Sequence, residues 1–288
     1  MNKLTIAEAI REGWHYLRDS DKDNPRLDSE VLLSHVLKKD RTALYRDLDE
    51  QLEPSEIQSY RKLLSDRAKG KPLAYIINNR EFMSLDFFVD ERVLIPRPET
   101  EIMVEAILQH SKGKAKESLI VDVGTGSGAI AISLVKNLAR GKILALDISL
   151  EALEVARNNS ERHQVGDRIE FVQSDLLEAL PQQYHGQIAW IAANLPYVPE
   201  VDRETLQTEV KDFEPHLALF GGKDGLDLYR RLIPQAAEFL SPQGYLICEI
   251  TPGQGEMLLG VFSEKAWFSG KIICDFAGLE RFVLVQRK

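Results

Sequence analysis

Residues 119–131, which read LIVDVGTGSGAIA, decide the fold of this chain. An apolar run of strand type enters a turn that contains Gly124, Gly126 and Gly128, and an apolar helical pattern follows the turn. Because glycine has no side chain, a ligand can approach the backbone amides that such a turn presents at the start of a helix. The stretch therefore predicts a strand, a glycine turn and a helix that together bind a nucleotide-like ligand.

Two ligands fit the spacing of this turn, since Gly124, Gly126 and Ala129 also satisfy the dinucleotide pattern G-x-G-x-x-[GA]. Asp147 follows the last glycine by nineteen positions, at the end of the next apolar run, where its carboxylate can accept bonds from both hydroxyls of a ribose. Asp122 distinguishes the two ligands, because a carboxylate just before the turn suits a cationic amino-acid group and repels a pyrophosphate. The pattern favours S-adenosylmethionine over NAD.

Asp175 ends the third apolar run, and two interpretations of it remain open. Its carboxylate fits a hydrogen bond from the adenine amino group, and it equally fits an N-cap for a following helix. Arg97 and residues 99–101 likewise fit either a capped helix start or a lid over the cofactor. We predict that the cofactor is held by Gly124, Thr125, Gly126, Ser127, Gly128, Asp147, Asp175 and Asn194.

Apolar strands and amphipathic helices alternate through the remainder of the chain. The candidate strands are residues 119–123, 143–147, 169–173, 188–192, 245–250, 271–274 and 282–285. Helices between most of them predict an α/β fold, a doubly wound parallel sheet covered by helices on both faces. The last two strands have no helix between them, so we expect an antiparallel hairpin at the edge of the sheet.

The first 75 residues show helical periodicity only, and they predict a small α-helical domain. Residues 76–95 contain short extended pieces that predict a β-hairpin connector, and Pro96 and Pro98 close it. The sheet domain then occupies residues 96–288.

Composition excludes several classes of protein. The 288 residues are 44% hydrophobic and 28% charged, which is the mix of a globular protein, and the net charge of −9 argues against direct nucleic-acid binding. No apolar stretch is long enough to span a membrane, no targeting segment opens the chain, and we expect a cytoplasmic protein. The scattered histidines show no metal-ligand spacing. Cys248 and Cys274 lie in apolar runs and are expected to be buried thiols.

Residues 194–197, which read NLPY, follow the fourth candidate strand and carry specific chemistry. A planar nitrogen becomes nucleophilic only when delocalisation of its lone pair is weakened. The side-chain oxygen of Asn194 and the backbone carbonyl of Leu195 can accept its two N–H bonds and orient it toward a methyl group. Pro196 stiffens the turn, and Tyr197 can stack on the flat amide. We predict Asn194 and Tyr197 as catalytic residues, and all four residues as the substrate site.

The tetrapeptide resembles the N-P-P-Y motif of N-methyltransferases that act on planar nitrogens. Together with residues 80–85 (REFMSL), 96–101 (PRPETE), 122–128, 249–250 (EI), 253–254 (GQ) and 277–281 (AGLER), it makes nearly the whole chain similar to the HemK/PrmC family. The resemblance implies a Rossmann-like class I fold that uses S-adenosylmethionine, yields S-adenosylhomocysteine and needs no metal. It further implies that the substrate is the glutamine of the Gly-Gly-Gln motif in peptide chain release factors, which the N-terminal domain docks.

Leu195 departs from the family pattern, which usually has proline at this position. The contact expected there uses the main-chain carbonyl, which leucine retains, so we expect activity to survive with a less rigid loop. The N-L-P-Y form also resembles rRNA adenine N6-dimethyltransferases, and that function is the alternative. The acidic balance, the aspartate at 122 and the N-terminal position of the accessory domain oppose it. A non-enzymatic alternative is a cofactor-binding protein that Leu195 has weakened in catalysis.

Overall fold

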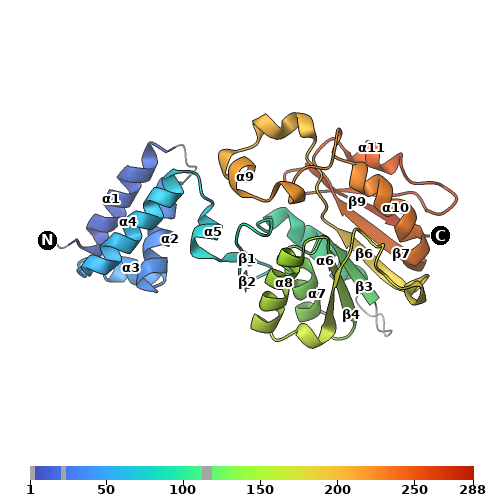
Figure 1. Ribbon diagram of the computed structural model, residues 1–288, viewed down its shortest axis with the longest axis horizontal. Coiled ribbons are helices and arrows are strands. Elements are labelled where there is room, and N and C mark those ends of the chain that lie inside the picture. Colours follow the sequence, from blue (N-terminus) through green and yellow to red (C-terminus); the bar gives the residue numbers. More distant parts are fainter. Residues whose placement is uncertain (1–3, 21–23, 112–118) are drawn as a thin grey trace. The chain divides into compact units, whose positions relative to one another are not determined.

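The computed structural model describes residues 4–20, 24–111 and 119–288. The chain divides into two compact units (Figure 1). The first comprises Met1–Asn79 together with Gln207–Phe213, and the second comprises Arg80–Leu206 together with Glu214–Lys288. Within the described ranges, no helix combines the length and the apolar character that crossing a membrane requires.

The first unit is helical, as the sequence predicts. Thr5 caps the first helix with a reciprocal capping box to Glu8, Asp40 caps the third, and Pro25 and Pro54 open the second and fourth, where a missing N–H costs nothing. Its helices are α1 (Ile6–Arg18), α2 (Pro25–Leu37), α3 (Arg41–Arg46), α4 (Pro54–Ala68), α5 (Leu73–Ile77) and α9 (Thr208–Phe213).

The core of this unit is built around Tyr60 on α4, whose side chain is fully buried. Its hydroxyl lies 3.3 Å from the carbonyl oxygen of Ala9 and 3.2 Å from that of Ser29. A Cβ at position 13 would lie 2.0 Å from the same hydroxyl, so the close approach of α1 and α4 requires Gly13. The apolar interior therefore encloses the Tyr60 hydroxyl with its hydrogen-bond partners.

The second unit contains the hairpin of β1 (Arg80–Phe82) and β2 (Leu85–Phe87) and a seven-stranded sheet. The order across the sheet is β5-β4-β3-β6-β7-β9-β8. The strands are β3 (Leu119–Val123), β4 (Lys142–Asp147), β5 (Ile169–Gln173), β6 (Ile188–Ala193), β7 (Leu240–Glu249), β8 (Lys271–Cys274) and β9 (Glu280–Gln286). The first five are parallel, and β9 pairs antiparallel with both β7 and β8. The predicted sheet and its antiparallel edge hairpin are confirmed.

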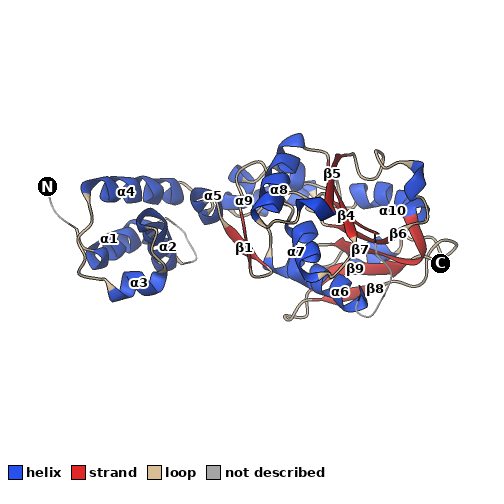
Figure 2. Ribbon diagram, turned by 90° about the horizontal axis from the view of Figure 1, so that it is seen from below, coloured by secondary structure: helices blue, strands red, loops and turns tan. Residues whose placement is uncertain are grey.

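Helices cover the sheet on both faces (Figure 2). Alternation along β3 places Val121 and Val123 in a cluster with α10, while Asp122 points to the other face and accepts a bond from the first turn of α7. The helices of this unit are α6 (Glu101–Ser111), α7 (Ala129–Asn137), α8 (Leu150–Arg162), α10 (Asp227–Phe239) and α11 (Gly255–Leu259), with short 3-10 turns that include η1 (Pro98–Thr100) and η5 (His216–Ala218).

Strand order changes direction between β3 and β6, which are neighbours although β4 and β5 come between them in sequence. In such sheets a crevice opens at the carboxyl ends of these two strands, and ligands bind there. The glycine turn follows β3 and the tetrapeptide follows β6, so the topology brings the two motifs together.

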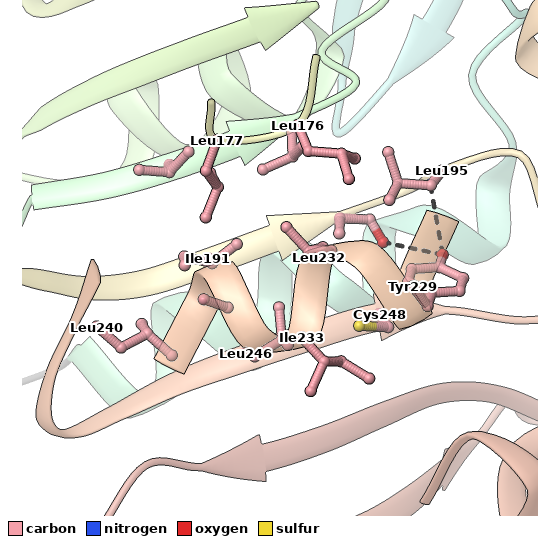
Figure 3. Close-up of a cluster of buried hydrophobic side chains, with 14 of the residues drawn as sticks. Leu176, Leu177, Ile191, Leu195, Tyr229, Leu232, Ile233, Leu240, Leu246 and Cys248 are labelled. Carbon is pink, nitrogen blue, oxygen red and sulfur yellow. Dashed lines mark hydrogen bonds between the residues drawn. The ribbon is translucent and has the colours of Figure 1, made fainter. Parts of the chain in front are cut away.

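The cysteines differ in burial. Cys248 on β7 is fully buried in the core cluster beneath α10, as predicted (Figure 3). Cys274 is exposed, so the prediction for it was wrong. It ends β8, and because β8 is an edge strand, one side of its apolar run remains open to solvent.

Candidate active site

A cavity of about 790 Å³ lies within the second unit, at the carboxyl ends of the central strands. Of the residues predicted from the sequence, it is lined by Gly124, Thr125, Gly126, Ser127, Asp147, Asp175, Asn194, Leu195 and Pro196. Gly128 and Tyr197 do not line it. The structure thus gathers nearly all the predicted residues around one space, although they come from four different strand ends.

The three glycines of the turn have different roles. All have positive φ, 75° at Gly124, 54° at Gly126 and 82° at Gly128, a region that other residues adopt only with strain. A Cβ at Gly126 would meet nothing within 4 Å, so this position faces open space. A Cβ at Gly128 would lie 3.0 Å from Ile132 and 3.2 Å from Ala156 of α8. Gly128 therefore lets α7 and α8 pack closely, which explains why it is absent from the cavity wall.

Asp147 lies at the end of β4 and faces the cavity. Its two carboxylate oxygens accept bonds from the backbone N–H groups of Gly126 and Ser149, each at 2.9 Å. Each oxygen keeps a second lone pair for a further donor, so the arrangement fits two ribose hydroxyls. Burial raises the pKa of Asp147, and the bonds from Ser149 and Gly126 oppose that rise.

Asp122 is fully buried beneath the turn and does not line the cavity. One of its oxygens accepts bonds from the Thr125 hydroxyl at 2.7 Å and the Ala131 N–H at 3.2 Å. The other has no partner among the described residues. Burial raises the pKa of Asp122 to about 7. Its contacts within the chain brace the turn against α7, and the contact with a cationic ligand that the sequence predicts stays a prediction.

Asp175 lines the cavity, but its carboxylate is already engaged by Arg231 of α10 at 2.7 Å. No helix starts directly after it, so the N-cap interpretation finds no helix to cap. The pair with Arg231 is exposed on both sides, 38% and 46%, which leaves room for the carboxylate to turn to a ligand donor.

The tetrapeptide follows β6, and contacts from distant parts of the chain hold it. The Asn194 amide donates from Nδ2 to Thr100 Oγ1 at 3.3 Å, and the Tyr197 hydroxyl donates to Glu249 Oε1 at 3.1 Å. Gln254 Nε2 donates to the carbonyl of Tyr197 at 3.0 Å. In the described part of the chain, no donor reaches Asn194 Oδ1 or the carbonyl of Leu195. Two acceptors therefore remain available at a residue pair that lines the cavity.

Leu195 is nearly buried, and its side chain belongs to the core cluster (Figure 3). Its Cδ2 would lie 3.2 Å from a Cβ at Gly124, so it packs directly against the glycine turn. Its N–H donates to the hydroxyl of Tyr229 at 3.4 Å, a bond that proline cannot make. The leucine thus ties the loop to the core by contacts that differ from those of the family's usual proline.

Sequence reasoning gave no role in holding the tetrapeptide to the residues behind the loop: Thr100, Tyr229, Glu249 and Gln254. Thr100 ends η1, and Glu249 ends β7 with a fully buried carboxylate. Thr100 Oγ1 donates to Glu249 Oε2 at 2.7 Å, and burial raises the pKa of Glu249 to about 7 against the bonds from Thr100 and Tyr197. Burial also raises the pKa of Tyr197 and of Tyr229 above the usual range, so both hydroxyls stay protonated. A lone glutamate at a strand end was the available sequence signal.

The site fits S-adenosylmethionine on the evidence of its own residues. The turn around Gly126 leaves open space where a side chain would stand, and Asp147 offers carboxylate oxygens beside it. Among the residues that the structure describes, no group of three or more His, Cys, Asp or Glu side chains could hold a metal ion.

Comparisons with known proteins agree with this arrangement. Residues 8–77 match the family described as "PrmC N-terminal domain", and residues 120–213 match "Methyltransferase domain". The release factor glutamine methyltransferase of Geobacter sulfurreducens is 41% identical over 279 residues, which cover 97% of this chain and 95% of that protein. The protein of the same name from Koribacter versatilis is 38% identical and covers 99% of both chains. The chain belongs to the release factor glutamine methyltransferase family.

Solved structures add the fold to this family assignment. The catalytic domain of hMettl16 in complex with an RNA hairpin has a TM-score of 0.56 at 16% identity and covers 77% of this chain and 81% of that one. The N-terminal domain of human METTL16 in complex with SAH has a TM-score of 0.52 at 18% identity, with 77% and 82% coverage. The second unit of this release factor glutamine methyltransferase family member thus has the methyltransferase fold, and the chain is an S-adenosylmethionine-dependent methyltransferase.

Proposed function

We propose that the chain transfers a methyl group from S-adenosylmethionine to the side-chain amide nitrogen, N5, of the glutamine in the Gly-Gly-Gln motif of peptide chain release factors. The observation that carries the proposal is the pair of unfilled acceptors, Asn194 Oδ1 and the carbonyl of Leu195, on the wall that also contains the glycine turn. The names of relatives that match nearly the whole chain support the substrate.

The residues around the cavity would act by positioning. The turn at Gly124 to Ser127 and Asp147 would hold the cofactor, which when bound supplies an electrophilic methyl group. Asn194 and Leu195 would each accept one N–H bond of the glutamine amide and aim its nitrogen. The aimed nitrogen would bond to the methyl carbon as the bond from that carbon to sulfur breaks, with the electron pair going to sulfur, and the nitrogen would then lose one proton to solvent. Holding the reactants in line accounts for most of the acceleration.

Tyr197 does not line the cavity, and its hydroxyl is engaged by Glu249. The predicted stacking of its ring on the glutamine amide therefore requires the substrate to reach beyond the cavity wall. Pro196 lines the wall and would restrict the turn between the two acceptors and Tyr197.

The direct test is to incubate the purified protein with a release factor and with cofactor that carries a labelled methyl group. We expect label on the intact factor and none on a factor in which the motif glutamine is replaced by alanine. Equal labelling of both factors would refute the glutamine assignment, and labelling of rRNA in place of the factor would support the adenine methyltransferase alternative. Cofactor binding without transfer to any factor would identify a weakened, non-enzymatic binding protein.

The helical first unit would dock the release factor, and the cytoplasm, where such factors act, would be its location. The match of residues 8–77 to the family described as "PrmC N-terminal domain" supports the docking role. Trp14 on α1 is 38% exposed, so replacing it with alanine should raise the KM for the factor and leave kcat unchanged. Phe276, fully exposed on the second unit, gives the matched control, and equal effects of both replacements would contradict docking by the first unit. Direct nucleic-acid binding is not part of the proposal, given the net charge of −9.

A further inference from the structure

Glu249 is an unusual carboxylate for a protein interior. It is 3% exposed, and none of the ion pairs found among the described residues includes it. Its two oxygens accept bonds from hydroxyls, Thr100 at 2.7 Å and Tyr197 at 3.1 Å. Burying a carboxylate that forms no ion pair is costly, and Glu249 carries this cost directly behind the tetrapeptide.

Glu249, Thr100, Asn194 and Tyr197 form a hydrogen-bonded cluster, and its hydrogens can be assigned by counting donors. An ionised carboxylate only accepts, so Thr100 must use its single hydroxyl hydrogen on Glu249. The oxygen of Thr100 is then free only to accept, and it faces the side-chain amide of Asn194 at 3.3 Å. Asn194 must therefore turn its NH₂ group toward Thr100 and its oxygen away from it. The carboxylate thus fixes which end of the amide remains for a ligand.

We propose that Thr100 and Glu249 are positioning residues that fix the amide orientation of Asn194, so that its oxygen and not its NH₂ group meets the substrate. The same carboxylate holds the Tyr197 hydroxyl, so it sets both ends of the tetrapeptide. The catalytic consequence rests on the proposed function, whereas the orientation of Asn194 can be measured without any substrate.

The charge state of Glu249 controls the orientation of the Asn194 amide. A protonated Glu249 can donate to Thr100, which can then donate to Asn194 Oδ1, and the amide reverses. The pKa of Glu249, raised by burial to about 7, puts this change near neutrality. The titratable and charged groups that face it are Glu99 of η1, which raises the pKa, Arg281 of β9, which lowers it, and the protonated hydroxyls of Tyr197 and Tyr229.

Substitutions at Thr100 separate the hydroxyl from the shape of the side chain. Thr100→Val keeps the size and removes the hydroxyl, so we expect kcat for methyl transfer to fall about 10- to 100-fold while the Kd for the cofactor is unchanged. Thr100→Ser keeps the hydroxyl and should retain most of the activity. Thermal melting of each variant identifies any that fail to fold.

Glu249→Gln tests the carboxylate with almost no change of shape. We expect a similar fall in kcat. We also expect the parent protein to lose activity as the pH drops below about 7, and this loss should be absent from the profile of the variant. Asp122 also has a pKa near 7 but is unchanged in this variant, so an acid limb caused by Asp122 would persist. Glu30→Gln is the matched control, because Glu30 is also a buried carboxylate but lies in the first unit, outside the cluster.

NMR of the side-chain NH₂ group of Asn194 gives a measurement that is independent of activity. Its resonances can be assigned because they are absent from the spectrum of Asn194→Ala. In the parent protein they should shift with a midpoint near pH 7, and this titration should vanish in Glu249→Gln and in Thr100→Val. The proposal would be overturned if these resonances changed neither with pH nor with either substitution. It would also be overturned if both variants had the same kcat as the parent protein. A parent protein that does not methylate release factors, yet shows this titration, would overturn the proposed function and leave the positioning role standing.

Discussion

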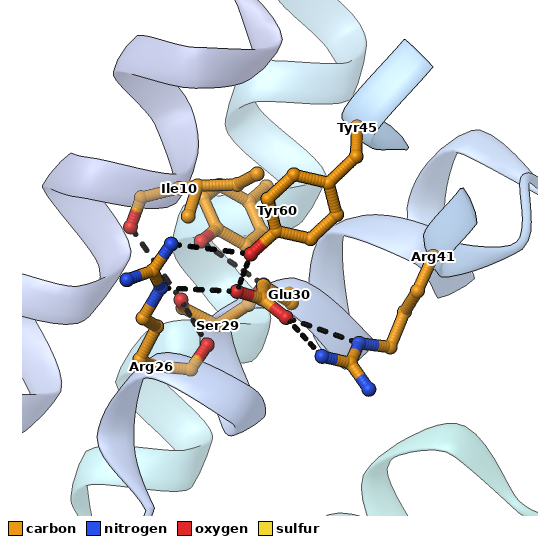
Figure 4. Close-up of polar contacts among 7 residues, drawn as sticks. All are labelled: Ile10, Arg26, Ser29, Glu30, Arg41, Tyr45 and Tyr60. Carbon is orange, nitrogen blue, oxygen red and sulfur yellow. Dashed lines mark hydrogen bonds and ion pairs between the residues drawn. The ribbon is translucent and has the colours of Figure 1, made fainter. Parts of the chain in front are cut away.

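Glu30 on α2 and Glu249 on β7 are both almost completely buried, 2% and 3% exposed, but their surroundings differ. Glu30 accepts bonds from Arg41 at 2.6 Å, from Arg26 at 3.2 Å and from the hydroxyl of Tyr45 (Figure 4). Glu249 accepts from two hydroxyls only. The first carboxylate connects α2 to α3 within the helical unit, and the second stands behind a cavity wall.

The two pKa values move in opposite directions. Burial raises the pKa of Glu30, but the bonds from Tyr45, Arg41 and Arg26 outweigh it, and the net pKa lies below its usual value. Burial dominates at Glu249, whose pKa rises to about 7. A buried acid surrounded by cations is stabilised in one charge state, whereas a buried acid surrounded by hydroxyls keeps both states within reach. The contrast separates a structural carboxylate from one suited to a site.

The largest expected effect tests whether Glu249 acts through the tetrapeptide. Asn194→Ala removes one acceptor and should lower kcat by about 100- to 1,000-fold. Adding Glu249→Gln to that variant should change kcat by less than about 3-fold, since residues that act as one unit are not additive. The measurement is kcat for the parent, both single variants and the double variant. Independent, multiplicative losses would show that Glu249 works by another route.

Glu30→Gln should act on stability and not on catalysis. It leaves Arg41 and Arg26 without their carboxylate, but both are more than half exposed and can turn to water, so we expect a loss of about 2 kcal/mol in the free energy of unfolding. Urea unfolding measures the loss, and kcat of the folded protein should be unchanged. Glu12→Gln breaks the exposed pair with Arg61 and should cost less than about 1 kcal/mol. A comparable loss of stability in Glu30→Gln and Glu12→Gln would show that burial does not make the ion pairs of Glu30 stronger than an exposed pair.

The pH dependence of these stability effects should have opposite signs. A folded-state pKa below the unfolded one stabilises the protein above the unfolded value of about 4.3 and loses that contribution as the pH falls through the folded value. The cost of Glu30→Gln should therefore shrink in acid. The pKa of Glu249 is raised to about 7 in the folded state, so the parent loses stability as the pH rises from about 4.3 to about 7, and Glu249→Gln should gain stability relative to the parent over that range. The measurement is the melting temperature of the parent and of both variants across this pH range. Curves of melting temperature against pH that run parallel for the two variants would contradict the prediction.

The smallest effect concerns Leu195. Leu195→Pro keeps the carbonyl but removes the N–H that reaches Tyr229 and most of the contact with the glycine turn, so stability should fall by about 1 kcal/mol with kcat within about 2-fold of the parent. Leu195→Ala retains the N–H and separates the two contributions. A large change in kcat for the proline variant would mean that loop rigidity, and not the carbonyl alone, limits the reaction.

The order of motifs along the chain was sufficient to predict the layers of the fold. Strand and helix periodicities, the glycine turn and the missing helix before β9 depend on neighbouring residues, and each was placed correctly. Predictions that depended on distant partners fared differently. Cys274 was expected inside because its run is apolar, but sheet position decides its exposure. Segment 207–213 joins the helical unit through an ion pair between Glu209 and Arg67 at 2.7 Å. No local sequence pattern predicts that contact.

The sequence by itself indicated the cavity wall at Gly124, Gly126, Asp147 and residues 194–196, because glycine conformation and strand-end position are local properties. Only the tertiary structure decided that Gly128 packs against α8, and that Asn194 rests on Thr100 and Glu249, which lie 94 and 55 positions away in the chain. Hydrogen-bond partners across such separations are chosen by how strands and helices pack, and burial then sets the charge of the carboxylate at their centre.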